Sequence, residues 1–337
     1  MMKVLFSGFK DANHSASGGY DKITDMPVDK TTLLVDRYPL GRLDIGNHLI
    51  RIPLSLLDVE TRLRRFRYDI THLFYGEISM LFFLPYLRSR KHKTVITLHH
   101  GPDKRRIPSL FVSLLRHFDG IVVLSSGMKK ELKEKYGLES EFIPHGFYKP
   151  RFEHREVADR KGRRLDAEKI NVITIGQMYR DYDTFEYIVE RMKTRADLRF
   201  HLVGAPADVK ERMRKYEEEE GNVSVYNRLP DDEFYSLISD CDYCFLPLTF
   251  ATANNTLLEA QFLDVPAILP DIEGVLDYAA PAPMNYYYHD RRRLEEIFTS
   301  LSKSKKNGEI AGYMEKFDWK NVFVALEKYY NRLLNGK

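Results

Sequence analysis

The residues best placed to do chemistry in this sequence lie in a short polar turn between two apolar segments. Asn254, Asn255 and Thr256 form the end of this turn, and Glu259 follows one helical turn later. Free backbone N–H groups, a hydroxyl and the positive end of a helix suit a phosphate. The carboxylate of Glu259 can accept hydrogen bonds from two vicinal hydroxyls at once. A nucleotide-sugar presents a diphosphate beside a diol, so the pattern predicts a nucleotide-sugar site.

The elements around this turn predict how it is positioned. Residues 243–246 are an apolar run ended by Pro247 and indicate a buried strand. A helix is expected from about residue 257 to 263, closed by Asp264 and Pro266, with the next strand at 267–269. This order is a βαβ unit. The competing interpretation is an ordinary crossover that binds no ligand.

The rest of the chain repeats this alternation of strands and helices, which is typical of parallel doubly wound sheets. We expect an N-terminal domain at residues 1–150, a charged linker at 151–169, a second domain at 170–315 and a closing segment at 316–337. Further strands are expected at residues 3–7, 31–35, 68–72, 94–98, 120–125, 171–175, 198–203 and 223–226. Further helices are expected at 46–67, 79–90, 127–136, 184–194, 207–220 and 231–239.

Length and composition agree with two globular domains, since the chain has 337 residues, 43% of them hydrophobic. Two cysteines in this length indicate a reducing compartment. The first residues predict a strand rather than a secretion signal. We therefore expect a cytoplasmic protein, free or peripheral on the inner face of the cell membrane.

Charge is distributed unevenly along the chain. Residues 1–150 hold 24 Lys and Arg against 16 Asp and Glu, although the whole chain carries only +3. The excess gathers at residues 62–67, 88–93 and 104–106, and the last two clusters adjoin apolar stretches at 80–86 and 107–115. Such a combination suits an anionic membrane surface, and the alternative is a solvated rim around core helices. Nucleic acid is not expected as a partner, because no recognisable binding module accompanies the charges.

The polar turn before Glu259 and the elements around it resemble the site that binds the sugar donor in GT-B glycosyltransferases, most closely in the retaining glycosyltransferase family 4. The resemblance rests on the strand, the small polar loop, Leu-Leu-Glu-Ala at residues 257–260 and Pro-Ala-Ile at 266–268. Glu259 matches the second Glu of the family's motif. The first Glu should lie eight residues earlier, where this chain has Ala251. Asn254 and Asn255 match a pair that some family members carry.

Other segments resemble the family in the same order, so that the resemblance covers nearly the whole chain. They are residues 68–72, 121–132, 142–148, 173–182 and 317–320, the last containing the only Trp. The resemblance implies two Rossmann-like domains facing a cleft, with a final helix that crosses back to the N-terminal domain. It also implies a nucleotide-sugar donor and a glycan or lipid-linked acceptor.

The resemblance further implies how the reaction proceeds. Negative charge develops on the diphosphate and is neutralised by cations and helix N-termini, without a metal and without any other cofactor. Arg180 is the only cation in the loop at 176–182, so it is assigned to the diphosphate. The family retains anomeric configuration with no dedicated enzymatic nucleophile, so no catalytic carboxylate is named.

Four further residues complete the predicted site. His99 ends the strand at 94–98 and matches the family's histidine, whose side chain or backbone contacts the transferred sugar, and His100 is the alternative if the register differs by one residue. Gly18 and Gly19 allow backbone amides to approach a phosphate closely, although a plain turn also explains them. Arg228 follows a strand of the second domain, where the nucleotide base is expected.

Several other patterns carry little weight. Cys241 and Cys244 form a CxxC with no second pair, which indicates core cysteines rather than a zinc site. No glycine-rich fingerprint follows the first strand, which argues against a nicotinamide enzyme. The sequence therefore predicts a glycosyltransferase. The alternatives are a nucleotide-sugar-binding protein without turnover and a GT-B phosphorylase or epimerase.

Overall fold

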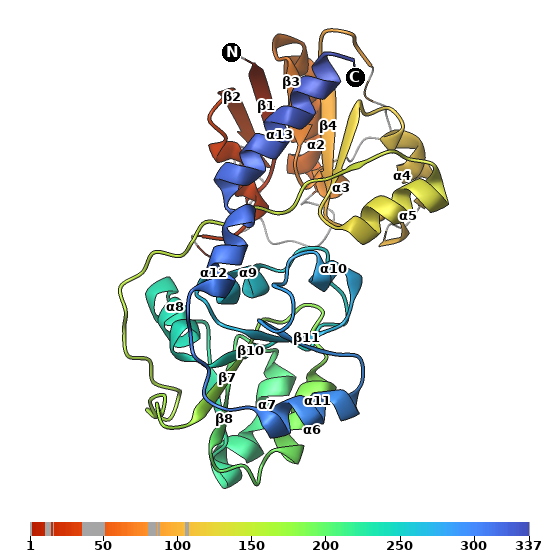
Figure 1. Cartoon of the computed structure of the whole chain (residues 1–337). Coiled ribbons are helices and arrows are strands. Elements are labelled where there is room, and N and C mark those ends of the chain that lie inside the picture. Colours follow the sequence, from red (N-terminus) through yellow and green to blue (C-terminus); the bar gives the residue numbers. More distant parts are fainter. Residues whose placement is uncertain are drawn as a thin grey trace. The chain divides into compact units, whose positions relative to one another are not determined.

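The computed structural model of the protein describes residues 2–10, 15, 17–35, 51–79, 86, 88–104 and 108–336. Two compact units are present (Figure 1). The N-terminal unit comprises the described residues of 1–14, 18–147 and 317–337. The C-terminal unit comprises those of 15–17 and 148–316.

The N-terminal unit is built on a parallel sheet, and six of its strands lie in the described residues, in the order β2-β1-β3-β4-β5-β6. These strands are β1 (Lys3–Gly8), β2 (Asp29–Leu34), β3 (Ile70–Leu73), β4 (Lys93–Leu98), β5 (Gly120–Val123) and β6 (Glu141–Phe142). β3 and β5 are buried along their whole length. Such burial is expected of a parallel sheet covered by helices on both faces.

Its α-helices are α2 (Arg51–Arg64), α3 (Gly76–Ser79), α4 (Pro108–Leu115), α5 (Ser126–Tyr136) and α13 (Trp319–Leu334). Short 3₁₀ turns are η1 (Tyr20–Asp25), η4 (Arg65–Arg67), η5 (Pro102–Lys104) and η7 (Glu315–Phe317), which leads into α13. The closing helix α13 belongs to this unit through its buried Trp319. A Cβ added to Gly146 would lie 2.3 Å from the Trp319 ring, so the indole requires a glycine there.

Of the two interpretations of the apolar stretch at 107–115, the structure supports a core helix, since α4 packs inside the N-terminal unit. Phe111, Val112, Leu114 and Leu115 of α4 are buried in one apolar cluster with β4 and β5. The apolar stretch beside the third basic cluster is therefore not an exposed membrane-facing surface. Most of the stretch at 80–86 lies outside the described residues, and its Tyr86 is buried.

The C-terminal unit also has a parallel sheet, with six strands in the described residues in the order β12-β11-β10-β7-β8-β9. They are β7 (Ile170–Ile175), β8 (Leu198–Val203), β9 (Val223–Tyr226), β10 (Tyr243–Phe245), β11 (Ala267–Pro270) and β12 (Tyr286–Tyr288). The α-helices are α6 (Tyr182–Arg191), α7 (Ala207–Lys215), α8 (Asp231–Asp240), α9 (Asn255–Phe262), α10 (Glu273–Leu276), α11 (Arg291–Ser300) and α12 (Glu309–Met314). A π-helical turn, η6 (Tyr216–Glu220), follows α7. Cys241 and Cys244 are buried thiols of this core, as the sequence indicated.

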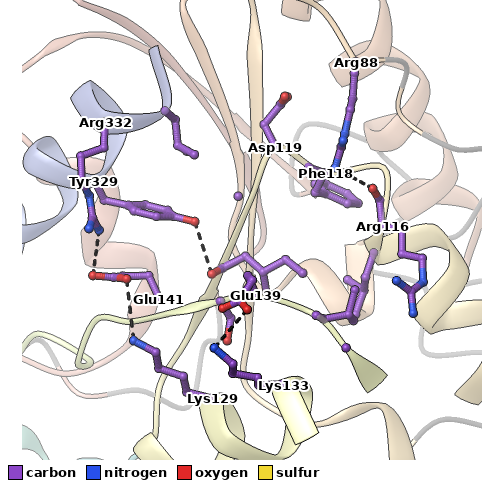
Figure 2. Close-up of a pocket in the computed structure, with 17 residues that line it drawn as sticks. Arg88, Arg116, Phe118, Asp119, Lys129, Lys133, Glu139, Glu141, Tyr329 and Arg332 are labelled. Carbon is purple, nitrogen blue, oxygen red and sulfur yellow. Dashed lines mark hydrogen bonds and ion pairs between the residues drawn. The ribbon is translucent and has the colours of Figure 1, made fainter. Parts of the chain in front are cut away.

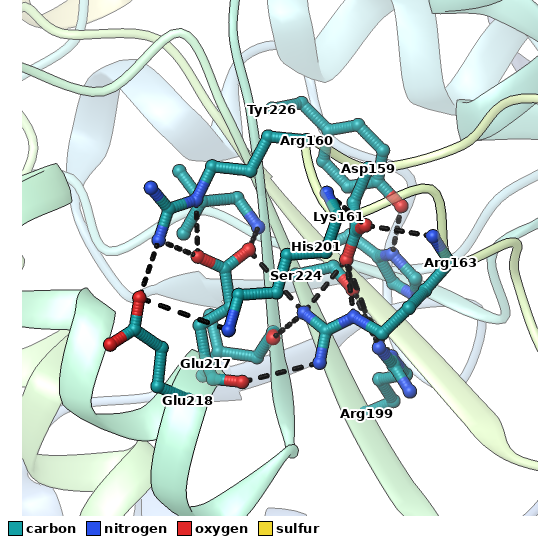
Figure 3. A network of polar contacts seen from close by, with 12 residues as sticks. Asp159, Arg160, Lys161, Arg163, Arg199, His201, Glu217, Glu218, Ser224 and Tyr226 are labelled. Atoms are coloured by element: carbon teal, nitrogen blue, oxygen red, sulfur yellow. Dashed lines mark hydrogen bonds and ion pairs between the residues drawn. The ribbon is translucent and has the colours of Figure 1, made fainter.

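The segment expected as a linker, 151–169, is attached to the C-terminal unit by a polar network (Figure 3). Arg163 donates to Asp159 at 2.7 Å and to the carbonyl oxygen of Val223 at 3.1 Å. Asp159 also accepts from Ser224, and Arg160 donates to the buried Glu217. The charges of this segment are thus used to hold it against β9 and η6.

None of the helices in the described part of the chain has both the length and the apolar content that a membrane span requires.

Candidate functional site

The strand order marks where a ligand site is expected in the C-terminal unit. β7 has β8 and β9 on one side and β10, β11 and β12 on the other. The crossover connections therefore change direction between β7 and β10. Open α/β sheets bind ligands at such a point, beside the carboxyl ends of the strands. Residues 176–181 follow β7 at this edge, and residues 246–254 follow β10.

Backbone hydrogen bonds join these two loops. The amide of Asp181 donates to the carbonyl oxygen of Pro247 at 2.7 Å. The amide of Thr249 donates to the carbonyl oxygen of Tyr179 at 3.0 Å. Arg180 and Leu248 form the antiparallel bridge between them. The backbone that carries Arg180 is therefore held beside the loop that leads into α9.

The guanidinium of Arg180 folds back over its own loop. Its Nε donates to the carbonyl oxygen of Ile175 at 2.8 Å, and Nη2 lies 3.5 Å from the hydroxyl of Thr256. Gly176 has a φ of 98°, and a Cβ there would lie 3.1 Å from Nη2, so the close approach favours glycine. Burial lowers the pKa of Arg180, and the nearby Tyr182 and Glu259 act in the opposite direction. The site thus holds a partly desolvated cation.

Helix α9 begins two residues earlier than its apolar pattern indicated, because Asn254 caps it. The Asn254 side chain accepts from the amide of Leu257 at 3.0 Å, which satisfies one free donor of the first turn. Its structural role is therefore to start the helix, and Asn255 is the first helical residue. Thr256 and Glu259 are buried on this helix.

Glu259 accepts a hydrogen bond from the hydroxyl of Ser15 at 2.8 Å. Tyr235 on α8 is a second neighbour, since burial and then the charge of Glu259 raise its pKa to about 12. Sequence reasoning missed both Ser15 and Tyr235. Ser15 is distant in the sequence, and Tyr235 lies in a helix whose pattern indicates packing alone.

Arg228 is exposed just after β9. In the sheet, β9 is separated from β7 by β8. The structure brings Arg180, Thr256 and Glu259 together, and Arg228 follows the last strand in the described strand order.

His99 occupies the carboxyl end of β4 in the N-terminal unit, as predicted. Its backbone amide donates to Oε1 of Glu77 at 3.1 Å, and its Nδ1 lies 3.5 Å from the same oxygen. The ring stacks on Tyr75 with 4.2 Å between centroids and meets the edge of Tyr20 at 5.0 Å. Tyr75 and Glu77 come shortly after β3 and are not among the residues predicted from the sequence.

Gly18 and Gly19 lead into η1 and place Tyr20 in the core. Gly19 has a φ of 94°, which favours glycine. The amide of Tyr20 donates to the hydroxyl of Tyr75 at 3.2 Å. The two glycines therefore adjoin the aromatic residues that surround His99.

A buried chain of polar groups supports this region. Nδ1 of His72 lies 2.5 Å from the Tyr330 hydroxyl oxygen, and Nε2 of His72 lies 2.6 Å from the Thr97 hydroxyl oxygen. The Thr97 hydroxyl lies 3.1 Å from that of Tyr20. Burial and then the charge of His99 lower the pKa of His72 to about 3, so it stays neutral near pH 7. This chain ties α13 to β3, β4 and η1.

A separate cavity of about 700 Å³ lies near the amino-terminal start of β5, between α5 and α13 (Figure 2). Glu141 pairs there with Arg332 at 2.8 Å, and Lys133 pairs with Glu139 at 3.2 Å. The described residues that line the cavity include no predicted site residue. Its position sets it apart from the residues around His99.

Solved structures with a similar fold include glycosyltransferases. Sucrose-phosphate synthase from Thermosynechococcus elongatus has a TM-score of 0.67 and 15% identity, covering 99% of this chain and 89% of that one. The lipopolysaccharide outer core galactosyltransferase WaaB has a TM-score of 0.65 and 14% identity, covering 99% of each chain. Alr3699/HepE from Anabaena, solved with UDP and glucose, has a TM-score of 0.64 and 12% identity, covering 98% of this chain and 100% of that one. Among curated proteins, no sequence matches.

Family models match both units. Residues 19–147 match Glycosyltransferase Family 4, and residues 169–296 match Glycosyl transferases group 1. The two matches together cover about three quarters of the chain, and each falls mainly on one of the two parallel sheets with its helices. The two parallel sheets and the residues at their carboxyl ends agree with these matches. The chain therefore belongs to the glycosyltransferases of the GT-B fold and resembles family 4.

Proposed function

We propose that this glycosyltransferase moves a sugar from a nucleoside-diphosphate sugar to a glycan or lipid-linked acceptor, in the synthesis of a cell-surface polysaccharide or glycolipid. The observation that carries the proposal is the cluster of Arg180, Thr256 and Glu259 at the start of α9. A cation, a hydroxyl, helix N-terminal amides and a carboxylate occur there in one small region. The UDP and glucose in the Anabaena structure support a nucleoside diphosphate as the leaving group.

The chemistry follows from the charge that develops on the leaving group. The anomeric C–O bond to the diphosphate breaks while the acceptor oxygen bonds to the same carbon, and the acceptor proton passes to the departing phosphate. Arg180 and the amides of Asn255 and Thr256 would stabilise that phosphate, and their effect is larger in a site that excludes water. With no nucleophilic carboxylate assigned, we propose a transfer that retains the anomeric configuration without a metal ion.

Glu259 would bind the two ribose hydroxyls. Its Oε1 now accepts from Ser15, so the ribose would replace or share this hydrogen bond. Ala251 supplies no carboxylate for the transferred sugar, and its carbonyl oxygen packs against Gly274, where a Cβ would lie at 1.7 Å. His99, whose backbone amide donates to Glu77, is proposed as a polar contact to the transferred sugar.

We also propose peripheral association with the inner face of the cell membrane, where a lipid-linked acceptor is found. The support is the positive excess of residues 1–150. Electrostatic attraction of about 1 kcal/mol for each basic residue near an anionic surface accumulates over such clusters.

A panel of nucleotide-sugars tests the proposal. Donors that raise the melting temperature would then be incubated with and without candidate acceptors, and nucleoside diphosphate release would be measured. Release that requires acceptor supports the transferase. Tight binding without release would support a nucleotide-sugar-binding protein, which the missing carboxylate at Ala251 favours as the second candidate.

Two further measurements address the stereochemistry and the metal. The anomeric configuration of the product, read by NMR, should match that of the donor. Turnover should survive an excess of chelator. Inverted product or activity restored only by a divalent cation would overturn the corresponding part of the proposal.

A further inference from the structure

Helix α2 and the turn η4 carry apolar residues on two opposite faces. The inner face packs in the N-terminal unit through Leu54 and Leu57, which are buried together with Asp58, Thr61 and Arg65. These positions recur every three or four residues, as expected for one side of a helix. The inner face alone accounts for how the helix is attached to the sheet.

The outer face carries a second apolar stripe. Leu56, Val59, Leu63 and Phe66 are 44%, 42%, 74% and 52% exposed. Their spacing of three, four and three residues places them on one side, opposite the buried stripe. Among the described residues, they are four of the eight large apolar side chains that are exposed. A concentration of this kind is unusual on a free surface and marks an interaction site.

The inner residues hold the helix in a fixed orientation. The hydroxyl of the buried Tyr86 donates to Asp58, which also pairs with Arg62 at 2.9 Å. The Arg62 guanidinium lies over the Tyr86 ring, 3.9 Å from its centroid. These contacts prevent the helix from rolling over to bury its outer stripe.

Positive charge surrounds the stripe. Arg64 and Arg67 lie beside it on the same segment. The ring of Phe66 meets the edge of His92 at 5.6 Å, which brings the basic segment 88–93 next to the stripe. Residues 56–69 and 88–93 together hold eight Lys or Arg and three Asp or Glu. Two basic clusters that are separate in the sequence therefore form one surface with the stripe.

We propose that this surface, the outer face of α2–η4 with residues 88–93, docks on an anionic phospholipid bilayer. The stripe would enter the boundary between headgroups and acyl chains, while the arginines would contact lipid phosphates, as interfacial amphipathic helices do. A second copy of the chain is a poorer occupant, because two such surfaces would bring like charges together. The inference deepens the peripheral association proposed above and assigns it to named residues.

Vesicle co-sedimentation of the full chain tests the proposal, using phosphatidylglycerol-containing vesicles and pure phosphatidylcholine vesicles. The natural sequence should bind the anionic vesicles, and about 0.5 M salt, which screens charges beyond roughly 4 Å, should weaken the binding. The double variant L63S/F66S should bind at least tenfold more weakly. The matched control L276S/V324S removes two other exposed apolar side chains, 47% and 49% exposed, and should bind like the natural sequence.

Equal binding by L63S/F66S, or no binding of the natural sequence to anionic vesicles at low salt, would overturn the proposal. Dimerisation that L63S/F66S abolishes, seen by sedimentation velocity without lipid, would instead identify a self-association face. Melting temperatures should be alike for all variants, because the substituted side chains are exposed. Donor binding by the same preparations is measured by thermal shift without lipid, so a failure to bind vesicles is distinguishable from a failure of the proposed transfer reaction.

Discussion

At the scale of single residues, the candidate donor site depends on two charged side chains that are both partly or wholly buried. Glu259 and Arg180 lie close enough for each charge to affect the surroundings of the other. Burial strengthens such interactions and makes each group costly to leave unpaired. Substitutions at these two positions should therefore have different consequences for binding and for turnover.

Glu259→Ala should weaken donor binding about ten- to a hundredfold, because hydrogen bonds to a charged group contribute about 1.5–3 kcal/mol. Isothermal titration with the best donor of the panel measures the effect. Glu296→Ala, on the exposed side of α11, serves as the control. An unchanged affinity for Glu259→Ala would remove Glu259 from the donor site.

Arg180→Ala should lower kcat by roughly a hundredfold while KM changes little, because phosphate charge is largest in the transition state. Arg180→Lys should recover only part of the rate, since a lysine cannot reproduce the bonds to Ile175 and Thr256. Steady-state kinetics measure both variants, with Arg292→Ala as an exposed control. A normal kcat for Arg180→Ala would mean that the arginine only orders its loop.

His72 and His201 are buried, and burial lowers the pKa of each to about 3. In the unfolded chain these two imidazoles take up protons near pH 6.5, whereas in the folded chain they remain neutral until the pH is much lower. Stability is therefore full above pH 6.5 and falls as the pH decreases toward 3, by up to about 1.4 kcal/mol per pH unit for each histidine. Urea unfolding at pH 7 and pH 5 measures the loss. The free energy of unfolding should decrease less between these pH values in His201→Gln than in the natural sequence. An identical decrease would contradict the lowered pKa of His201.

At the scale of elements, the start of α9 combines helix capping with the predicted phosphate site. Asn254→Ala should lower stability by about 1 kcal/mol through the lost cap. Asn254→Asp should keep the cap and yet weaken donor binding, because a carboxylate would repel the diphosphate. Asp290 caps α11 in the same way through Arg293, so Asp290→Ala should cost similar stability without affecting the donor. Thermal unfolding and titration separate the effects, and unaltered donor binding by Asn254→Asp would argue against a phosphate at this helix.

At the scale of the whole molecule, each unit has its own core, so damage to one should leave the other folded. Gly146→Ala would place a Cβ 2.3 Å from Trp319 and should destabilise the N-terminal unit by about 1–3 kcal/mol. Hydrogen exchange read by mass spectrometry should show faster exchange in β1–β6 and α13, with β7–β12 unchanged. Gly312→Ala, where a Cβ meets nothing within 4 Å, is the control. Equal loss of protection in both sheets would show that the units unfold together.

Much of this architecture could be predicted from local patterns in the sequence. Apolar runs such as residues 170–175 and 198–203 identify buried parallel strands, because both of their faces are covered. The position of His99 after β4 could also be predicted, since strand ends are local features. The apolar pattern places the start of α9 two residues too late, because the cap by Asn254 adds residues that are not apolar.

Only the tertiary structure decided the features that depend on contacts between distant segments. No local pattern predicts that Ser15 meets Glu259, that Glu77 meets His99, or that the segment 151–169 is bound to β9. Helices α2 and α4 illustrate the physical reason. Helical periodicity shows which residues share a side of each helix, but which side is buried depends on the sheet beneath it. Packing buries one side of α2 and leaves Leu63 and Phe66 in solvent, whereas Phe111 and Leu115 of α4 face the core.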